Sequence, residues 1–477
     1  MENKRAKKNL NKIYVIIFLV FITTVKLSGQ VTIKNQAEFT YWKEYDRNIF
    51  EDWFDFSYQK NFLQLGLRYE INHPPDPFIF PKDTLLNEYE LTYRYAEFFY
   101  KNLTANVGNF YSMFGRGLTL RTYEDRNLRV DNNIEGIKLN LSGSIYKIQG
   151  IAGKMRDKYN RREDIIYGID GEIDITENLL LGESYLYQPE PEDNTSGFWS
   201  SRLTFTQDWG DFYGEIVKPD WADNFSYYLA LNAAYSKFAA TIEYKDYNQM
   251  SFKNSYGSEY NAAPSLTREH TFALLNRHPH ALNQNDEKGY QVEITYFPSD
   301  EWEFLLNFSR TFNHGHKTIF EEYYGEIHHY FGEHIDCRFA GAWTFDFTTN
   351  TDNITPIVDL LYDFSPRDQL HFSYQHQHTI NKSDKSEYDN ELLLLEYSRA
   401  PLFSLALVGE YTNKNQVNNV TMDRKYWLYG NLTLNLWTNY QLSILYGSRQ
   451  EGFICAGGIC RYEPEFEGVE IKLINRF

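Results

Sequence analysis

The sequence lacks any apolar run after residue 29 that could form a membrane-spanning helix. Its uninterrupted aliphatic stretches are short, as in residues 392–395, whereas a spanning helix needs about 20 apolar residues. Helical periodicity is missing as well, and mean hydropathy is only -0.57. These absences argue against a helical membrane protein. They leave a transmembrane barrel open, because the alternating apolar and polar residues of its strands cancel in such an average.

Catalytic motifs are also missing. The chain contains no Gly-x-Ser-x-Gly, no His-Glu-x-x-His and no phosphate-binding glycine run. Its 12 histidines are scattered, and neither His278 with His280 nor His376 with His378 has a carboxylate at a persuasive spacing for a metal site. We therefore expect no cofactor, no metal and no enzyme. A hydrolase assembled in space at the rim or wall of a barrel is the remaining catalytic alternative.

Positive charge and cysteine are both scarce. Lys and Arg total 47 against 65 Asp and Glu, a net charge of -18, which argues against a nucleic-acid partner. Of three cysteines, Cys455 and Cys460 favour a disulfide in a loop outside the reducing cytosol. A metal site is the rival interpretation, but no nearby His or third Cys completes it. Cys337 falls on the apolar face of its expected strand.

The first 29 residues have the three parts of a secretory signal peptide. A basic start is followed by the short apolar run 13–22 and then by small Ser28 and Gly29. We therefore predict a cleaved signal peptide at 1–29, export by a Gram-negative bacterium, and a single domain at 30–477. An uncleaved N-terminal anchor is the alternative. Strands begin almost at once, near Val31, so we expect no N-terminal plug domain and no TonB box.

Aromatic residues are abundant, with 39 Tyr, 35 Phe and 9 Trp making up 17% of the chain. Such residues suit a boundary between lipid and water, and outer-membrane barrels carry them in two girdles. The closing sequence GVEIKLINRF alternates, with Val469, Ile471, Leu473 and Phe477 on one face. Ending on Phe477 resembles the terminal signal that the barrel-assembly machinery recognises. Asn475 departs from that pattern.

Turn residues divide the chain into strands whose connections alternate between short and long. Short links such as 60–61, 143–144, 177–178 and 210–211 alternate with long ones. The long links are residues 73–87, 114–132, 156–164, 190–197, 249–287, 381–388 and 449–464. This rhythm predicts an all-β, transmembrane antiparallel β-barrel of about 24 strands, with short periplasmic turns and long extracellular loops. Secreted sandwiches and propellers are the water-soluble alternatives, but the chain shows neither linkers nor a repeat.

Two long loops contain the candidate functional residues. A barrel of this width needs a plug, so the first loop could fold inward and form a charged constriction that selects solutes. Its alternative is a surface loop whose charges pair with one another. The candidate constriction residues are Arg116, Arg121, Glu124, Asp125, Arg126, Arg129 and Asp131, with Gly115 and Gly117 allowing a sharp bend.

The second loop is residues 249–287, the longest link. Its apolar residues Phe272, Leu274 and Leu275 indicate that it packs on the lumen wall or on another loop. Its charged residues form the candidate plug: Arg268, His270, Arg277, His278 and His280.

Three stretches together resemble a known family: residues 108–139, 273–291 and 452–473. The family consists of uncharacterised outer-membrane barrel proteins, classified as a domain of unknown function. The resemblance implies a barrel and a surface location, and it implies no activity. We expect contacts with outer-membrane lipid and lipopolysaccharide.

Three functions are compatible with the sequence. The first is a passive pore or transporter for small solutes. The second is a structural barrel, plugged by its own loops, that binds an unidentified surface or periplasmic partner. The third, less favoured, is a surface enzyme.

Overall fold

The computed structural model describes residues 29–80, 84–189, 195–277, 280–414, 416–417, 420–421, 424–456 and 459–477. The predicted signal peptide, apart from Gly29, and His278 lie outside these residues. Within them, no helix has the length and apolar character required to cross a membrane. The one helical turn described is the 3₁₀ segment η2 (Leu275–Arg277). Everything else that is regular is strand.

Twenty-four strands form one sheet in which each is antiparallel to its neighbours. They are β1 (Gln30–Trp42), β2 (Arg47–Lys60), β3 (Leu63–Asn72), β4 (Tyr89–Tyr100), β5 (Leu103–Phe110), β10 (Ile134–Ser142), β11 (Tyr146–Met155), β12 (Ile165–Thr176), β13 (Leu179–Pro189), β14 (Thr195–Gln207), β15 (Gly210–Pro219), β16 (Ser226–Tyr235), β17 (Phe238–Asn248), β18 (Asp286–Ser299), β19 (Trp302–Phe312), β20 (Thr318–Phe331), β21 (Ile335–Asp346), β22 (Thr351–Ser365), β23 (Asp368–Asn381), β24 (Glu387–Arg399), β25 (Phe403–Thr412), β28 (Tyr426–Leu436), β29 (Tyr440–Arg449) and β32 (Phe466–Arg476).

Short two-stranded ribbons occur in the loops. They are β6 (Met113–Phe114) with β7 (Leu120–Arg121), β8 (Glu124–Asp125) with β9 (Val130–Asp131), β26 (Gln416–Val417) with β27 (Val420–Thr421), and β30 (Gly452–Ala456) with β31 (Ile459–Glu463).

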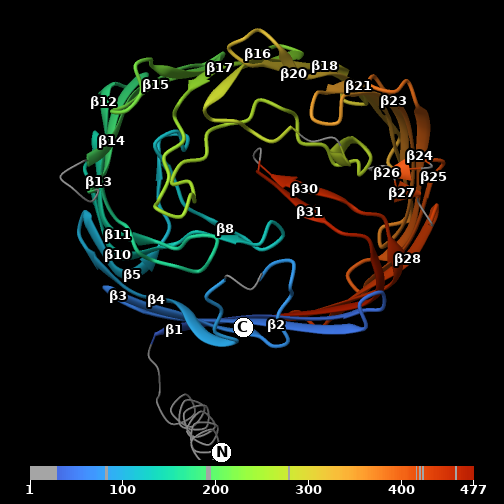
Figure 1. Cartoon of the computed structure of the whole chain (residues 1–477), viewed down its shortest axis with the longest axis horizontal. Coiled ribbons are helices and arrows are strands. Elements are labelled where there is room, and N and C mark those ends of the chain that lie inside the picture. Colours follow the sequence, from blue (N-terminus) through green and yellow to red (C-terminus); the bar gives the residue numbers. More distant parts are fainter. Residues whose placement is uncertain are drawn as a thin grey trace, which may run out of the picture.

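The sheet closes on itself through its first and last strands (Figure 1). β1 pairs with β32 in a register that sets Lys34 opposite Arg476 and Trp42 opposite Gly468. The backbone of Phe477 continues this pairing, because its N–H and C=O bond the C=O and N–H of Ile33 at 2.8 Å each. The predicted closed antiparallel barrel of about 24 strands is therefore confirmed. Whether Phe477 is also an assembly signal stays a prediction.

The connections alternate as expected. Links of two or three residues lie at the end of the barrel that holds Phe477, which we call the inner end, and the longer links lie at the outer end. One predicted turn is displaced: residues 210–211 begin β15, and the turn is residues 208–209. The outer links 43–46, 220–225, 313–317, 347–350 and 413–425 were not predicted.

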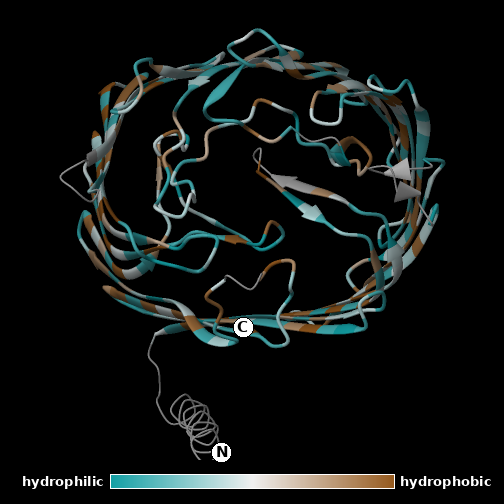
Figure 2. Cartoon of the chain, in the orientation of Figure 1, coloured by the Kyte–Doolittle hydropathy of each residue, from teal (hydrophilic) through white to brown (hydrophobic). Residues whose placement is uncertain are grey.

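The two faces of the sheet have opposite chemistry. On β10 the outward Ile137, Leu139 and Leu141 are exposed, and such exposed apolar side chains recur on the outside of strand after strand. Inward-facing polar side chains, such as Glu51 of β2 and Asn307 of β19, are buried. Figure 2 shows the resulting alternation of brown and teal around the wall. An apolar exterior around a polar interior is typical of a barrel surrounded by lipid.

Aromatic side chains flank this apolar exterior. Near the inner end, Phe238 of β17 stacks on Tyr296 of β18 with ring centroids 4.5 Å apart. Further outward, Tyr290 of β18 meets Phe308 of β19 at 5.6 Å. Leu306 of β19, 65% exposed, falls between these two levels on the outward face. This arrangement resembles the aromatic girdles of outer-membrane barrels.

Asn475 interrupts the apolar face of the last strand for a local reason. The register sets it opposite Asn35 of β1, and its amide donates to Asn35 Oδ1 at 3.2 Å. Asn35 in turn donates to the carboxylate of Asp52 on β2. Three polar side chains across the closing seam are therefore linked by hydrogen bonds, which lowers the cost of placing them on the outer face, although Asn475 Oδ1 has no partner among the described residues.

A charged residue at Leu306 should destabilise the barrel if lipid surrounds this face. We expect Leu306→Arg to lower the free energy of unfolding by about 2–4 kcal/mol, because arginine is costly near the middle of a bilayer. Urea unfolding of protein folded into liposomes measures the change. The matched control is Leu402→Arg in an inner turn, where the leucine is 54% exposed, and equal losses for both variants would contradict a lipid-facing Leu306.

Candidate functional site

Several outer loops fold into the lumen rather than projecting away from the barrel (Figure 1). We call residues 111–133, between β5 and β10, the charged loop, and residues 249–285, between β17 and β18, the strap. The ribbon β30–β31 also lies within the ring. The largest buried apolar cluster joins these inward segments to the wall, with Phe114, Leu118 and Leu120 of the charged loop fully buried. The core of the molecule is therefore inside the lumen.

Two glycines allow the charged loop to turn. Gly115 has φ +53° and Gly117 has φ +89°, conformations that side-chain-bearing residues rarely adopt. A Cβ at Gly115 would also meet the carboxylate of Glu215 at 2.7 Å. The bend predicted at these glycines is therefore present, and it directs the following apolar residues into the core.

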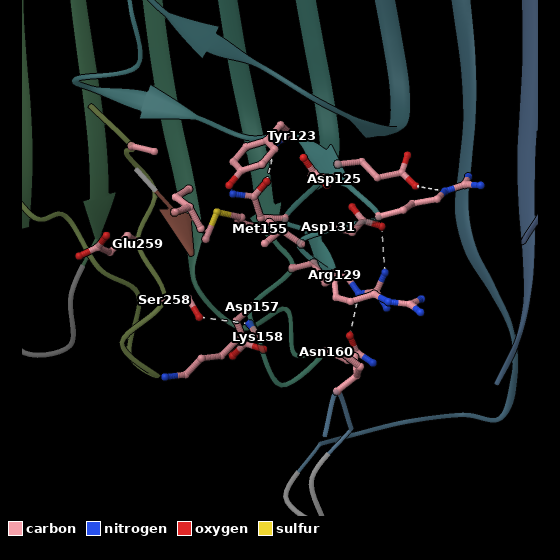
Figure 3. A pocket seen from close by; sticks show the side chains of 18 of the residues that line it. Tyr123, Asp125, Arg129, Asp131, Met155, Asp157, Lys158, Asn160, Ser258 and Glu259 are labelled. Atoms are coloured by element: carbon pink, nitrogen blue, oxygen red, sulfur yellow. Dashed lines mark hydrogen bonds and ion pairs between the residues drawn. The ribbon is translucent and has the colours of Figure 1, made fainter. Parts of the chain in front are cut away.

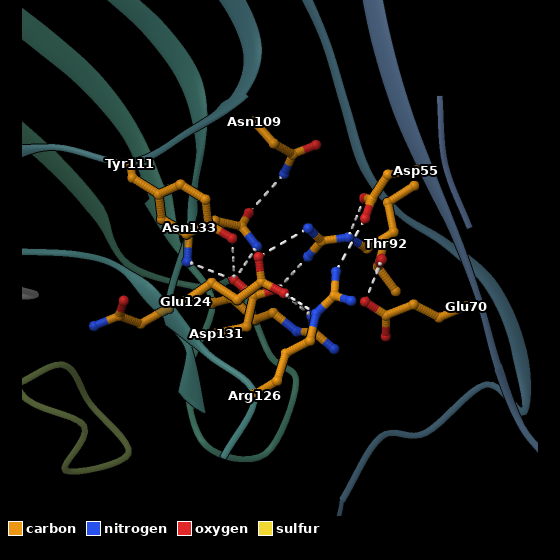
Figure 4. Close-up of polar contacts among 12 residues, drawn as sticks. Asp55, Glu70, Thr92, Asn109, Tyr111, Glu124, Arg126, Asp131 and Asn133 are labelled. Atoms are coloured by element: carbon orange, nitrogen blue, oxygen red, sulfur yellow. Dashed lines mark hydrogen bonds and ion pairs between the residues drawn. The ribbon is translucent and has the colours of Figure 1, made fainter. Parts of the chain in front are cut away.

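Four side chains, two of each sign, form a closed ring of ion pairs between the charged loop and the wall. Arg126 contacts Asp55 of β2 at 3.0 Å and Glu124 at 2.8 Å. Arg68 of β3 contacts the same two carboxylates, Asp55 at 2.6 Å and Glu124 at 2.8 Å. Figure 4 shows Asp55, Glu124 and Arg126 converging. We call Asp55, Arg68, Glu124 and Arg126 the charge ring.

Arg129 fixes the next turn of the charged loop to the wall. Its guanidinium lies 2.6 Å from a carboxylate oxygen of Glu51 and 3.4 Å from one of Glu38. It also lies 5.2 Å from the ring centroid of Trp53, a cation–π contact. The partners of Arg129 thus come from β1 and β2, which are remote from it in sequence.

Asp131 is held by several donors at once. It contacts Arg156 at 3.0 Å, and it accepts hydrogen bonds from Tyr111 at 2.9 Å and Asn133 at 2.7 Å. Burial alone would raise the pKa of Asp131. The charges of Arg156 and Arg68, together with these hydrogen bonds, outweigh burial and hold the pKa below its usual value.

The other candidate residues of the charged loop have different roles. Arg116 donates to Tyr228 Oη at 3.0 Å and lies 4.4 Å from the ring centroid of Tyr213. Asp125 Oδ1 accepts backbone N–H bonds from residues 127 and 128, so it orders a turn. Arg121 stacks over Tyr123 at 5.1 Å. The charged loop therefore folds inward, but its charges pair mainly with side chains of the wall. The sequence-based alternatives were a constriction that selects solutes and a surface loop whose charges pair with one another, and neither describes this arrangement in full.

The strap follows the inner wall from β17 to β25. One end is fixed by Lys245, a fully buried lysine that contacts Glu287 and the carbonyl of Ser265. His280 lies 3.0 Å from the second oxygen of Glu287. Further contacts join basic side chains of the strap to wall carboxylates: Arg268 to Glu293 of β18, His270 to Glu322 of β20, and Arg277 to Glu410 of β25.

The apolar residues of the strap pack against the wall as predicted. Phe272 and Leu275 join Leu305 and Tyr324 in one cluster, and Leu274 joins a second with the wall strands β24 and β25. Here the inner wall is apolar instead of polar. The described plug candidates thus lie along the wall rather than across the lumen.

Two cavities lie beside the charged loop. The upper cavity, about 440 Å³, is lined by outer segments that include Tyr123, Arg129, Asp157 and Ser258 (Figure 3). The lower cavity, about 1030 Å³, is lined mainly by wall strands toward the inner end. Glu124 and Arg126 line both cavities. The charge ring therefore stands between the two cavities.

Sequence reasoning missed the wall partners. Glu51, Trp53 and Asp55 alternate along β2 and so share its inward face, a signal that was available, but nothing in the sequence indicates which loop they contact. Cross-strand partners of the histidines were also missed: His376 contacts Glu391 and His378 contacts Asp389 of the adjacent β24, each at 2.8 Å. Among the described residues, no group of three or more His, Cys, Asp or Glu could hold a metal ion.

The cysteines occupy the expected places. Cys337 is a free, buried cysteine. Cys455 of β30 lies opposite Cys460 of β31 in the register of their ribbon, as a disulfide requires. The bond stays a prediction, because the side chain of Cys455 is outside the part of the chain that the structure describes.

The model of a family of unknown function, DUF6029, matches residues 10–477. The chain belongs to this family. The resemblance noted from the three sequence stretches is therefore confirmed, as is the barrel architecture that it implied. Comparison with curated proteins finds no significant match.

Solved outer-membrane barrels resemble the chain at low identity. An E. coli P pilus tip assembly intermediate, PapC-PapD-PapK-PapG, matches with TM-score 0.56 and 7% identity over 94% of this chain and 61% of that one. The P pilus usher (PapC) translocation pore gives 0.49 and 8% over 94% and 99%. The copper transporter OprC gives 0.45 and 10% over 94% and 81%. Such identities show the fold alone.

Acid should loosen the charged loop through Asp131. Because the folded-state pKa of Asp131 is lowered, its ionised form stabilises the loop above the ordinary aspartate pKa, and this stabilisation is lost as pH falls through the folded value. Hydrogen exchange of residues 111–133 should therefore accelerate in acid. Asp131→Asn should exchange faster at neutral pH and respond less to acid, whereas Asp125→Asn, which keeps the turn acceptor, should match the parent; an unchanged acid response in Asp131→Asn would contradict this role.

Proposed function

We propose that the barrel lies in the outer membrane of a Gram-negative bacterium and is a pore or transporter for small solutes. Solutes would enter the upper cavity from the outside, pass the charge ring and leave through the lower cavity. The observation that carries this proposal is that Glu124 and Arg126 line both cavities. Rearrangement of these two side chains would be the step that joins the cavities.

The chemistry of the lumen supports solute passage. Polar and charged side chains line both cavities, and rings of charge select solutes in other pores. The charge ring contains two cations and two anions, so its net charge is balanced and it imposes no single sign. It therefore favours small polar solutes over simple ions of one charge. A fold shared with an assembly intermediate that contains the usher PapC is compatible with this class of function.

Removing the ion pairs at the charge ring should widen the path. We expect the double variant Glu124→Ala and Arg126→Ala to show higher single-channel conductance than the parent in planar bilayers, because two long side chains at the partition become short. The control is Arg399→Ala, which removes an exposed ion pair with Asp368 at the inner rim. Electrical silence of the parent, of the double variant and of a deletion of residues 114–132 would contradict the pore.

Ion pairs between the inward loops and the wall favour a second function, a plugged structural barrel. The charged loop and the strap are both fixed by wall carboxylates, as the pairs of Arg129 with Glu51 and Arg277 with Glu410 illustrate. A lumen filled in this way suits a plugged barrel that supports a surface or periplasmic complex. The surface enzyme gains no support from these contacts.

The plugged barrel predicts a fixed partner. Pull-down of the tagged, full-length protein from solubilised membranes should recover the same partner in a constant ratio, while the purified protein stays electrically silent. A cysteine-free variant, Cys337→Ala with Cys455→Ser and Cys460→Ser, serves to exclude disulfide capture during extraction. Conductance without any constant partner would reject this second function and favour the pore.

A further inference from the structure

The upper cavity is built from segments that meet only in the folded chain. The charged loop provides Arg121 and Tyr123, the link after β11 provides Asp157 and Asn160, and the wall provides Glu51. Its volume, about 440 Å³, is within the range of small-molecule sites. Figure 3 shows Tyr123, Asp157 and Asn160 around this cavity. It is large enough for a small organic solute.

Two carboxylates at this cavity each keep one oxygen without a hydrogen-bond partner among the described residues. Glu51, 2% exposed, uses Oε2 for Arg129 at 2.6 Å, and its Oε1 has no partner. Asp157, 4% exposed, uses Oδ1 for the backbone N–H groups of Tyr159 and Arg161 at 2.8 Å each, and its Oδ2 has none. Buried acceptors of this kind are costly unless a donor reaches them.

Two cations at the same cavity complement these acceptors. Arg121 and Lys158 line it, and each contacts an aromatic ring, Tyr123 and Tyr159 respectively, at 5.1 Å. Neither forms an ion pair with a carboxylate within the described ranges, whereas Arg126, Arg129 and Arg156 all do. Arg121 and Lys158 are therefore available to an anionic group.

We infer that the upper cavity binds a small zwitterion, a free amino acid or a short peptide. The carboxylate of the ligand would bind Arg121 and Lys158, and its ammonium group would donate to Glu51 Oε1 and Asp157 Oδ2. Apolar residues Met155 and Leu282, which also line the cavity, accommodate the ligand's side chain. Binding of the zwitterion does not depend on the function proposed above. Its transport does, and there the inference names the class of solute that would pass.

Other ligand classes fit the same residues less well. An anion would leave the acceptors of Glu51 and Asp157 unpaired, and a simple cation would leave Arg121 and Lys158 without a counter-charge. A neutral saccharide could reach the acceptors, but it carries no charge for the two cations. Only a ligand with both signs satisfies both sets, because a charge-assisted bond is about twice as strong as a neutral one.

The first experiment uses the purified full-length protein in detergent and isothermal titration. The probes are L-alanyl-L-alanine, its N-acetyl derivative, its C-terminal amide, and glucose. We expect the dipeptide to bind, and each derivative to bind about tenfold more weakly or worse, because each loses one charge-assisted hydrogen-bonding group. Equal affinity for the three alanine compounds, or a preference for glucose, would overturn the inference.

Variants then assign each end of the ligand. Arg121→Gln should reduce the discrimination between the dipeptide and its amide, because only Lys158 is then left for the carboxylate, and should leave the discrimination against the N-acetyl derivative unchanged. Asp157→Asn, which keeps the Oδ1 acceptor of its turn, should do the converse. Asp300→Asn, in an inner turn, is the control and should bind like the parent. Discrimination that is undiminished in both cavity variants would overturn the assignment, and the probe series on the parent protein decides the inference even where a variant misfolds.

Flux through liposomes separates this inference from the proposed function. Binding without flux of the dipeptide would reject the pore and leave the zwitterion site standing. Flux or conductance without binding would reject the site and leave the pore standing. Both together, with the discrimination pattern above, would support both.

Discussion

The rest of the structure depends on one constraint: backbone N–H and C=O groups in contact with lipid must all be paired within the protein. An open sheet would leave two unpaired edges, so the first strand has to meet the last. The pairing of β1 with β32, continued by Phe477 and Ile33, removes both edges. This closure brings the two ends of the described chain together and fixes which side chains face the lumen.

Closure of so many strands creates an interior too wide for wall side chains to fill. The loops fill it. Their apolar residues form clusters with the wall, and their basic side chains contact carboxylates that alternation has placed on the inward faces of β2, β18, β20 and β25. Breaking one such pair leaves an uncompensated buried charge, which is strongly destabilising. The charged loop and the strap are therefore held in defined positions, and the spaces left between them have defined shapes.

Charged side chains have different roles in the charge ring and in the upper cavity. In the charge ring, Arg68 and Arg126 each pair with both Asp55 and Glu124. In the upper cavity, the available groups of Arg121 and Asp157 face the same space without matching each other. Ion pairs fix the loops to the wall, whereas the unpaired groups of the upper cavity are the ones that the proposed ligand would contact.

Period-two alternation, aromatic content and turn spacing were enough to predict the barrel and its strand count, because a strand with one apolar face alternates apolar and polar residues along the sequence. The bend at Gly115 and Gly117 and the packing of Phe272 were predictable because each depends on the type of the residue itself. The partners of Arg126, Arg129 and Arg277 were not, because they lie on strands far away in sequence whose inward residues look alike. Sequence therefore determined the wall. Only tertiary structure decided which loop charges are paired and which remain for a ligand, since that depends on distances that closure of the barrel sets.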